Sequence, residues 1–173
     1  MITEFESPEG IDIRLINESD IPGFQNCLDS VARERKYLAQ LKAPPVERVA
    51  KFVTEALGRG EVRIVAVDSS RVVGWCDITP HHWEGLDHVG ELGMGVLREY
   101  RRKGIGSSLL KAALAMAQKA GMEKVELDVF ASNKAAIELY ENMGFVIEGR
   151  RPKSRYIDGE YDDIVEMGLF LQS

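Results

Sequence analysis

A basic, glycine-containing segment stands where an apolar stretch gives way to a helical pattern. It reads Arg101-Arg102-Lys103-Gly104-Ile105-Gly106-Ser107. The first turn of a helix carries unpaired backbone N–H groups and a partial positive charge, so it binds anions. Gly104 and Gly106 lack the Cβ atoms that would hold a phosphate away from those groups. The segment favours a pyrophosphate-sized anion site; the alternative is a turn with solvated basic side chains, because a Gly-x-Gly pair alone is a weak motif.

Histidines and cysteines are few and unpatterned. His81, His82 and His88 share one segment, but their spacing suits neither a helical zinc pair nor a zinc finger. Cys27 and Cys76 are far apart, so no disulfide framework or cysteine zinc cluster is expected. We therefore expect no metal, and a reducing, cytoplasmic location.

Size and composition narrow the class of protein. The 173 residues predict a single domain over 1–173, and 45% hydrophobic with 29% charged residues are typical of a globular protein. The net charge of −6 argues against nucleic acid as a partner and is compatible with a cationic substrate such as an amine. The initial MITEFESPEG lacks the features of a signal peptide. No apolar run approaches the roughly 20 residues of a membrane span, so no membrane association is expected.

The elements that must position the basic segment follow from apolar periodicity and turn residues. Strands are expected at Ile11–Ile16, Val62–Val67, Val72–Ile78, Gly90–Val96, Lys124–Phe130, from Phe145, and at Tyr161–Leu171. Helices are expected at Ile21–Val31, Val46–Leu57, Gly104–Ala120 and after Asn133. The strands on either side of the Gly104–Ala120 helix should be parallel, within a mixed sheet whose N-terminal part is antiparallel. Asp158-Gly159 predicts a hairpin turn.

Two separated motifs carry a family resemblance. Val96-x-x-x-x-Arg101-x-x-Gly104-x-Gly106 resembles the acetyl-CoA signature V-x-x-x-x-[Q/R]-x-x-G-x-[G/A] of the GCN5-related N-acetyltransferases (GNAT). Asn133-x-x-Ala136-x-x-x-Tyr140-x-x-x-Gly144-Phe145 resembles a second recurring segment of that superfamily. The resemblance implies an α/β (α+β) GNAT fold, with a mostly antiparallel sheet of about seven strands and about four helices. Its parallel fourth and fifth strands would splay at the cofactor site.

The resemblance also implies an acetyl-CoA site. The backbone near Met94 would face the pantetheine arm, the loop amides would hold the pyrophosphate, and Tyr140 would sit by the sulfur. The residues implied in cofactor binding are Met94, Gly95, Val96, Arg101, Arg102, Lys103, Gly104, Ile105, Gly106, Ser107, Asn133, Ala136 and Tyr140. Three alternatives stay open: Asn133 only caps its helix, Tyr140 only packs in the core, and the Arg101 side chain is solvated.

Acetyl transfer needs a neutral amine, a stabilised carbonyl oxygen and a protonated leaving thiolate. Glu91 is the first candidate for the base, although alternation along a strand could turn it away from the site. Asp77, His81 and His82 are weaker candidates. Backbone N–H groups near Met94 would meet the oxygen, with the neighbouring glycines permitting a bulged strand.

Tyr140 suits the acid that protonates the thiolate. Neither cysteine falls at a motif position, which favours direct attack by the amine, through a tetrahedral intermediate, over an acyl-enzyme.

The acceptor pocket is expected to involve residues outside the motifs: Arg33, Tyr37, Trp75, Asp77, His81 and the Lys153–Tyr161 hairpin. Arg33 and Arg155 could pair with a substrate carboxylate. The tail from Glu148 to Asp163 resembles the branch that acetylates amino acids, related small amines and protein N-termini. The predicted acceptor is thus an amino acid or other small amine.

Three other functions fit parts of the sequence. The first is a ribosomal-protein-type N-terminal acetyltransferase acting on a peptide amine, and the second is a non-catalytic acyl-CoA-binding module. The third, a dinucleotide-binding fold, is disfavoured because the third glycine of its fingerprint is missing. A homodimer paired through the C-terminal strands is also expected.

Overall fold

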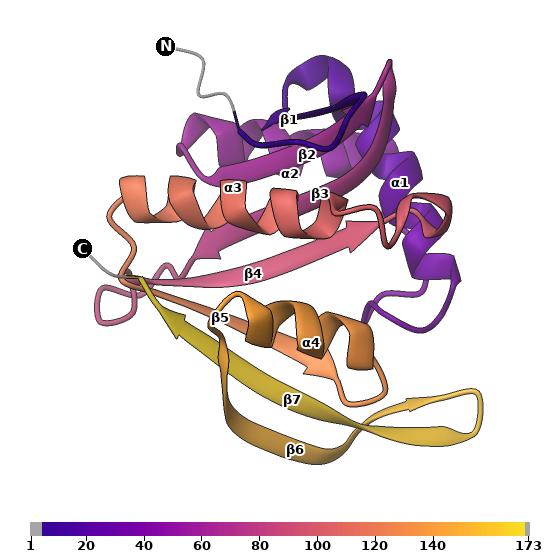
Figure 1. Ribbon diagram of the computed structural model, residues 1–173, viewed down its shortest axis with the longest axis vertical. Coiled ribbons are helices and arrows are strands. Elements are labelled where there is room, and N and C mark those ends of the chain that lie inside the picture. The colour runs from indigo at the N-terminus through magenta and orange to yellow at the C-terminus, as the bar shows by residue number, and fades with distance from the viewer. Residues whose placement is uncertain (1–4, 172–173) are drawn as a thin grey trace.

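One seven-stranded sheet runs through the computed structural model, which describes residues 5–171 (Figure 1). Its spatial order is β1-β2-β3-β4-β5-β7-β6, and only β4 and β5 are parallel neighbours. The expected mixed, mostly antiparallel sheet with four helices is confirmed. Residues 1–4, the start of the stretch in which we expect no signal peptide, and residues 172–173 lie outside the described range.

The predicted order of strands and helices is also confirmed. The strands are β1 Ile11–Leu15, β2 Val62–Asp68, β3 Arg71–Pro80, β4 Val89–Val96, β5 Lys124–Phe130, β6 Val146–Ile157 and β7 Glu160–Phe170. The α-helices are α1 Ile21–Arg33, α2 Val46–Gly58, α3 Ile105–Lys119 and α4 Lys134–Asn142. Most boundaries differ little from those expected. β3 extends past Ile78, for example, because Pro80 still pairs with Gly90 of β4.

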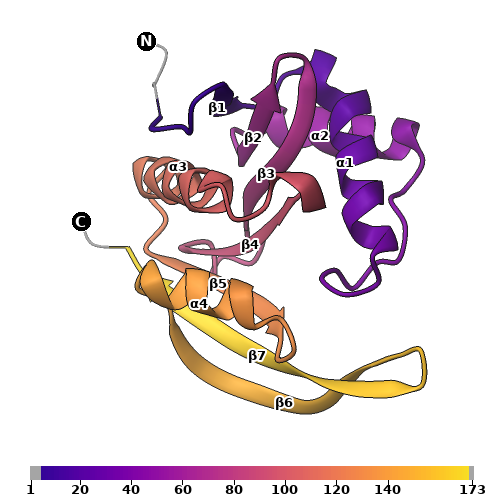
Figure 2. The same ribbon diagram turned by 45° about the vertical axis from the view of Figure 1, so that its right-hand side comes forward.

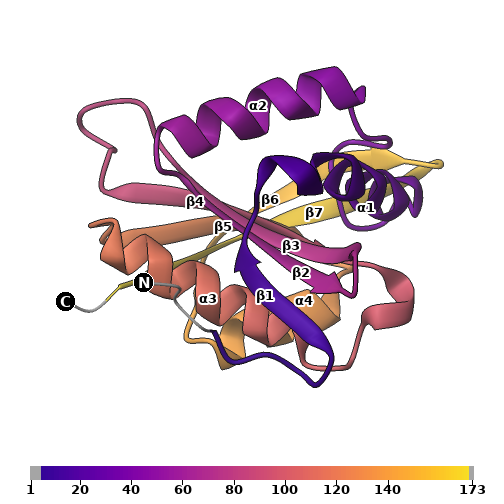
Figure 3. The same ribbon diagram turned by 90° about the horizontal axis from the view of Figure 1, so that it is seen from above.

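Helices cover both faces of the sheet. α1 and α2 lie on one face, and α3 and α4 lie on the other (Figures 2 and 3). α3 buries Ile105, Leu109, Ala113 and Ala117, residues that share one side of a 3.6-residue helix. Burying each large aliphatic side chain stabilises the fold by about 1.5–3 kcal/mol. Among the described residues, no helix has both the length and the apolarity needed to cross a membrane.

The C-terminal hairpin of β6 and β7 is closed by the expected two-residue turn. Asp158 and Gly159 both have positive φ, at 53° and 82°, which is the conformation of a type I′ turn. β7 lies between β5 and β6, so β6 forms one edge of the sheet. The hairpin extends beyond the rest of the sheet (Figure 1).

The parallel pair β4 and β5 separates along its length. The two strands pair only at Val89–Glu91 of β4, and they diverge toward their C-terminal ends (Figure 1). β4 stays paired with β3 up to Val96, and β5 stays paired with β7 up to Phe130. The β5-facing edge of β4 is therefore unpaired from Leu92 to Val96, and the predicted splay of the two strands is confirmed.

Candidate functional site

The start of α3 presents uncapped backbone donors to the gap left by the splayed strands. Gly104, the N-cap residue, has φ +80°, which glycine adopts at little cost, and no side chain caps the helix. A Cβ added at Gly106 would meet only Leu139 of α4 at 3.5 Å and Met94 of β4 at 3.7 Å. Gly106 therefore faces the gap between β4 and α4. These features fit a phosphate group seated on the helix N-terminus.

The side chain of Arg101, one of the residues implied in cofactor binding, is paired with Glu34 and is not simply solvated. Its guanidinium donates to both carboxylate oxygens of Glu34, at 2.9 and 2.5 Å, and its Nε donates to the Val96 carbonyl at 2.8 Å. It also lies 4.7 Å from the centre of the Tyr37 ring. Arg101 thus ties the loop before α3 to the segment after α1, while Arg102 and Lys103 remain exposed.

β4 contains no bulge, so that part of the expectation is wrong. Its pairing with β3 runs from Gly90 to Val96 without a shift in register. Glycine is needed at positions 93 and 95 because side chains of the neighbouring strand β3 occupy the space beside them. A Cβ at Gly95 would come within 2.3 Å of the Trp75 ring, and a Cβ at Gly93 would come within 3.1 Å of Asp77 Oδ1. The glycines make room for β3 side chains on the α1–α2 face.

α4 holds the remaining residues of the second motif. The Asn133 side chain accepts a hydrogen bond from the Ala136 amide at 3.3 Å, so it caps the helix. Tyr140 is 7% exposed, and its ring centre lies 5.7 Å from that of Phe145. Burial, with a smaller contribution from Cys76, raises the pKa of the Tyr140 phenol well above its usual value. Tyr140 therefore keeps its proton at neutral pH.

A cavity of about 410 Å³ lies on the α1–α2 face, against β4. This volume falls within the usual range for small-molecule sites. Its lining includes the mainly apolar residues Phe24, Leu28, Leu38, Val49, Phe52 and Trp75. The polar members are Gln40, Arg48 and Asp77, and the β4 residues Gly93 and Met94 complete one wall. Met94 thus borders both this cavity and, at Gly106, the gap next to α3.

Asp77 is the one carboxylate of the lining. Its Oδ2 lies 2.8 Å from Arg63 Nη1, and its side chain keeps 19% exposure. Burial raises the pKa of Asp77 to about 6, with Arg63 opposing the rise and Glu61 and Glu91 adding to it. Asp77 is therefore largely ionised at neutral pH and able to take a proton.

Sequence reasoning missed Arg63, the second residue of the buried strand β2. Its side chain is 4% exposed and contacts Glu61 at 3.1 Å, Thr79 at 3.0 Å and the face of Phe52 at 4.3 Å. A charged residue inside an otherwise apolar strand was the available signal, because such a side chain is rarely buried without partners. Arg48 and Phe24 also line the cavity, but nothing in the sequence pattern around them indicates a site.

Several residues predicted for catalysis or acceptor binding lie outside the cavity lining, including Tyr37, whose ring packs against the Arg101 guanidinium. Glu91 is exposed, although it shares a strand face with Gly93. Arg33 is exposed and pairs with Asp29 at 2.5 Å, one helical turn away. His81 is half-buried just after β3 and is not part of the wall. The structure thus brings Trp75 and Asp77 to the cavity but not these other residues.

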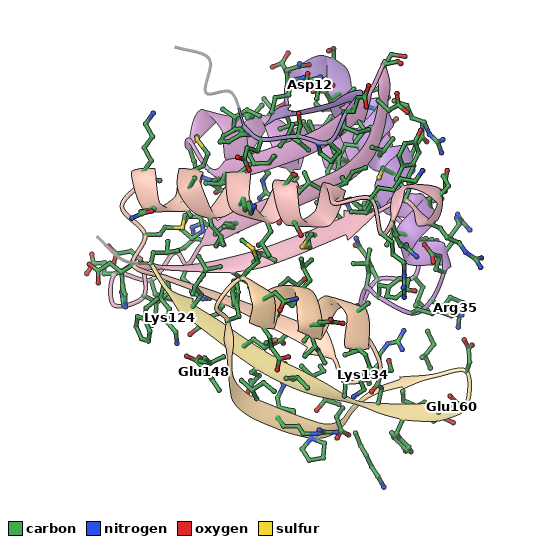
Figure 4. The ribbon with its side chains drawn as sticks, in the orientation of Figure 1. Asp12, Arg35, Lys124, Lys134, Glu148 and Glu160 are labelled. Atoms are coloured by element: carbon green, nitrogen blue, oxygen red, sulfur yellow. The ribbon has the colours of Figure 1, made fainter. Side chains whose placement is uncertain are left out.

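The segment Glu34–Tyr37, which we call the strap, joins the two halves of the sheet at the open end of the splay. Arg35 forms a two-point ion pair with Asp158 at the tip of the β6–β7 hairpin, at 2.7 and 3.0 Å. Arg155 donates to the Arg35 carbonyl at 2.6 Å, so it is engaged away from the cavity. Figure 4 shows Arg35 and the Glu160 end of the hairpin on the same side of the molecule.

Comparisons with known proteins agree on one family. A family model described as "Acetyltransferase (GNAT) family" matches residues 30–145. The chain is 31% identical over 109 residues to the L-amino acid N-acetyltransferase AaaT of Escherichia coli, covering 62% of this chain and 67% of that protein. It is 34% identical over 120 residues to an N-alpha-acetyltransferase of Saccharolobus solfataricus, covering 63% and 70%. A GNAT-family acetyltransferase structure from Streptococcus pneumoniae superposes with a TM-score of 0.87 at 26% identity, over 94% and 99% of the chains.

Proposed function

The chain belongs to the acetyltransferase (GNAT) family and is an acetyl-CoA-dependent N-acetyltransferase, and we propose that it acetylates a small primary amine directly. The observation that carries this proposal is the position of Met94. It borders the gap beside the start of α3 on one face of β4 and the apolar cavity on the other. An acetyl donor in the gap and an amine in the cavity would meet at this strand.

The residues around the gap fit acetyl-CoA. The unpaired edge of Leu92–Val96 offers backbone groups to an extended pantetheine arm, as an added strand would use them. The uncapped N–H groups of residues 104–107 would hold the diphosphate. When bound, acetyl-CoA supplies an activated acetyl group as its thioester.

Two groups of this chain are suited to the chemistry. Backbone N–H groups near Met94 are candidates for stabilising the carbonyl oxygen as charge develops on it. The Tyr140 phenol keeps its proton and can deliver it to the departing sulfur.

The two cysteines support direct transfer over an acyl-enzyme. Burial raises the pKa of Cys27 to about 12, and it raises the pKa of Cys76 well above its usual value. A thiol attacks a thioester as the thiolate. Neither side chain reaches that form readily at neutral pH, and neither lines the cavity. The amine is therefore the better nucleophile.

The test is a thiol-release assay with acetyl-CoA and a panel of primary amines, with the acetylated product identified by mass spectrometry. We expect saturable acetyl-CoA binding and turnover on small amines. Turnover only on peptides would support an N-terminal acetyltransferase. Binding without turnover on any amine or peptide would support an acyl-CoA-binding module, and no binding would remove the proposal.

The proposal extends to a cytoplasmic homodimer. Cys27 and Cys76 are both free thiols, which suits a reducing compartment. The edge of the sheet and the strand beside it expose large apolar side chains: Val146, Ile147, Tyr156, Tyr161 and Phe170. Pairing of two β6 edges would cover part of this surface, and sedimentation would show whether the protein is a dimer.

A further inference from the structure

The cavity lining has too few polar groups to suit a ligand that is polar throughout. Within the described lining, Arg48 is the only cation and Asp77 the only anion, and the remaining wall is largely aliphatic and aromatic. Arg48 is exposed, and its guanidinium has no ion pair or hydrogen bond among the described residues. Such a wall favours a ligand with an apolar body and one polar anchor.

Asp77 directs one of its two carboxylate oxygens away from its partner. Oδ2 is engaged by Arg63, whereas Oδ1 lies over Gly93, 3.1 Å from the position that a Cβ would take there. No group within the described chain donates a hydrogen bond to Oδ1. An acceptor in the cavity therefore has an ionised oxygen available beside the β4 backbone.

Asp77 shares its buried cation, Arg63, with a second carboxylate. Arg63 contacts both Asp77 and Glu61, and Glu61 is also paired with Arg59 at 2.7 Å. Glu91 on β4 adds negative charge from the same strand face, while Arg48 on α2 is the facing cation. An incoming ammonium group would give Asp77 Oδ1 a charged partner of its own.

We infer that the acceptor is a primary amine on an apolar body, and that Asp77 binds its ammonium group and takes its proton while the buried Arg63 positions the carboxylate. This inference rests on the proposed function and names the substrate class of that site. A diamine is disfavoured because its second ammonium group would lie in an apolar wall or against Arg48, a like charge.

The proton balance is simple. The ammonium N–H bond breaks, and the proton moves to Asp77, leaving a lone pair on nitrogen. That pair forms the C–N bond with the acetyl carbon, and the C–S bond breaks with its electrons remaining on sulfur. Tyr140 protonates the sulfur, and the proton then shed by the new amide nitrogen restores the phenol. Asp77 releases one proton to solvent per turnover.

Asp77→Asn tests the role of the carboxylate, with 2-phenylethylamine as acceptor. In the wild type, kcat/KM should rise with pH through about 6, because Asp77 must lose its proton to act as a base. In Asp77→Asn this rise should disappear and kcat/KM should fall by roughly 10²- to 10⁴-fold. The affinity for acetyl-CoA should stay within about twofold, since Asp77 lies on the cavity side of β4.

Two further variants make the Asp77 test specific. Asp12→Asn removes an exposed carboxylate from β1, at the far edge of the sheet, and should leave the profile unchanged. Glu91→Gln tests the rival base. Loss of the rise near pH 6 in Glu91→Gln, with retention in Asp77→Asn, would overturn the inference.

The pH at which kcat/KM rises tests whether Arg63 positions Asp77, because a purely structural role of Arg63 would leave that pH unchanged. Arg63→Lys retains the charge, so the rise in kcat/KM should stay within about one pH unit of its wild-type position. Arg63→Gln removes a charge that lowers the pKa of Asp77, so the rise should move up by about 1–3 units. A lower rate at every pH with no movement of the profile in Arg63→Gln would contradict positioning. If Arg63→Gln does not fold, the Arg63→Lys profile decides.

The substrate class is tested with acceptors that share an amine and differ in the body that carries it. Each buried methylene favours binding by about fourfold, so kcat/KM for 2-phenylethylamine and isoamylamine should exceed that for putrescine and glycinamide by at least about tenfold. Preference for putrescine or glycinamide would overturn the inference. An enzyme that binds acetyl-CoA but does not acetylate either apolar amine would overturn it too. Failure to bind acetyl-CoA would instead remove the proposed function.

Discussion

The two faces of β4 are built in different ways. On the α3 face, one continuous stretch from Leu92 to Ser107 supplies the unpaired strand edge, the loop and the helix start. On the α1–α2 face, the cavity draws residues from α1, α2, β3, β4 and the segment between the two helices. Backbone groups dominate the first face and side chains the second.

This difference affects how the two sites respond to substitution. A site made of backbone N–H groups is sensitive to what blocks access to them, whereas a side-chain site changes with each residue that lines it. We therefore expect acetyl-CoA binding to be lost only when a side chain blocks the backbone groups. Activity toward the acceptor should instead change gradually with each substitution in the cavity lining.

The largest effect is expected for Gly106→Glu. The new carboxylate would enter the gap that Gly106 faces and would occupy the anion site at the start of α3. Affinity for acetyl-CoA, measured by calorimetry, should fall by more than about 100-fold. The fold should persist, because the space around Gly106 admits a Cβ and a carboxylate favours a helix N-terminus.

Gly106→Ala is the matched control for this change. Its methyl group would make only ordinary contacts with Leu139 and Met94, and the signature that the chain resembles accepts alanine at this position, so acetyl-CoA should bind far more tightly than to Gly106→Glu. Unchanged affinity in Gly106→Glu would remove the anion site from the α3 face.

The next effect is expected for Tyr140→Phe, which removes only the phenol oxygen from a buried ring. Loss of a general acid should lower kcat by about 10²-fold or more, while acetyl-CoA affinity changes little. Because burial raises the pKa of Tyr140, the wild type should show no loss of rate from its ionisation at moderately alkaline pH. Wild-type turnover in Tyr140→Phe would show that this tyrosine serves packing alone.

A smaller effect is expected for Gly95→Ala, which probes the side-chain face. The new Cβ would overlap the Trp75 ring, with 2.3 Å to its nearest atom, so the ring or the strand must move. Overpacking of this kind should lower the free energy of unfolding by about 1–3 kcal/mol. Denaturant unfolding followed by tryptophan fluorescence measures it. Gly85→Ala, in a position with nothing within 4 Å, is the control and should unfold as the wild type does.

The smallest effect is expected for Asp158→Asn in the β6–β7 turn. Asparagine also suits a type I′ turn, so the substitution removes only the exposed ion pair with Arg35. Exposed ion pairs contribute little, and the acceptor KM should change by less than about threefold. A much larger change in KM would show that the strap, residues Glu34–Tyr37, shapes the acceptor cavity.

The sequence predicted most of the strands and helices and the acetyl-CoA site. The apolar alternation of Lys124–Phe130 and the helical spacing from Ile105 predict their elements because burial on one face sets the period. The donor site was readable for a related reason. A glycine loop that opens a helix is a local feature, so its residues are neighbours in the chain as well as in space.

The acceptor side could not be read in the same way. Strand alternation left the orientation of Glu91 open, and the fold placed it outside the cavity. It brought Asp77 there instead, with Arg63 behind it. The prediction that Gly95 permits a bulge in β4 was also wrong. Glycine is needed there because the Trp75 ring of the neighbouring strand occupies the space.

The sequence alone determined the family motifs, the order of the elements and the helix start that faces the gap, because each depends on residues close together in the chain. Only the tertiary structure decided which carboxylate lies beside the β4 backbone, which arginine supports it and what kind of wall surrounds it. Those contacts join α1, α2, β2, β3 and β4, and their geometry follows from strand register and helix packing, which no single segment specifies.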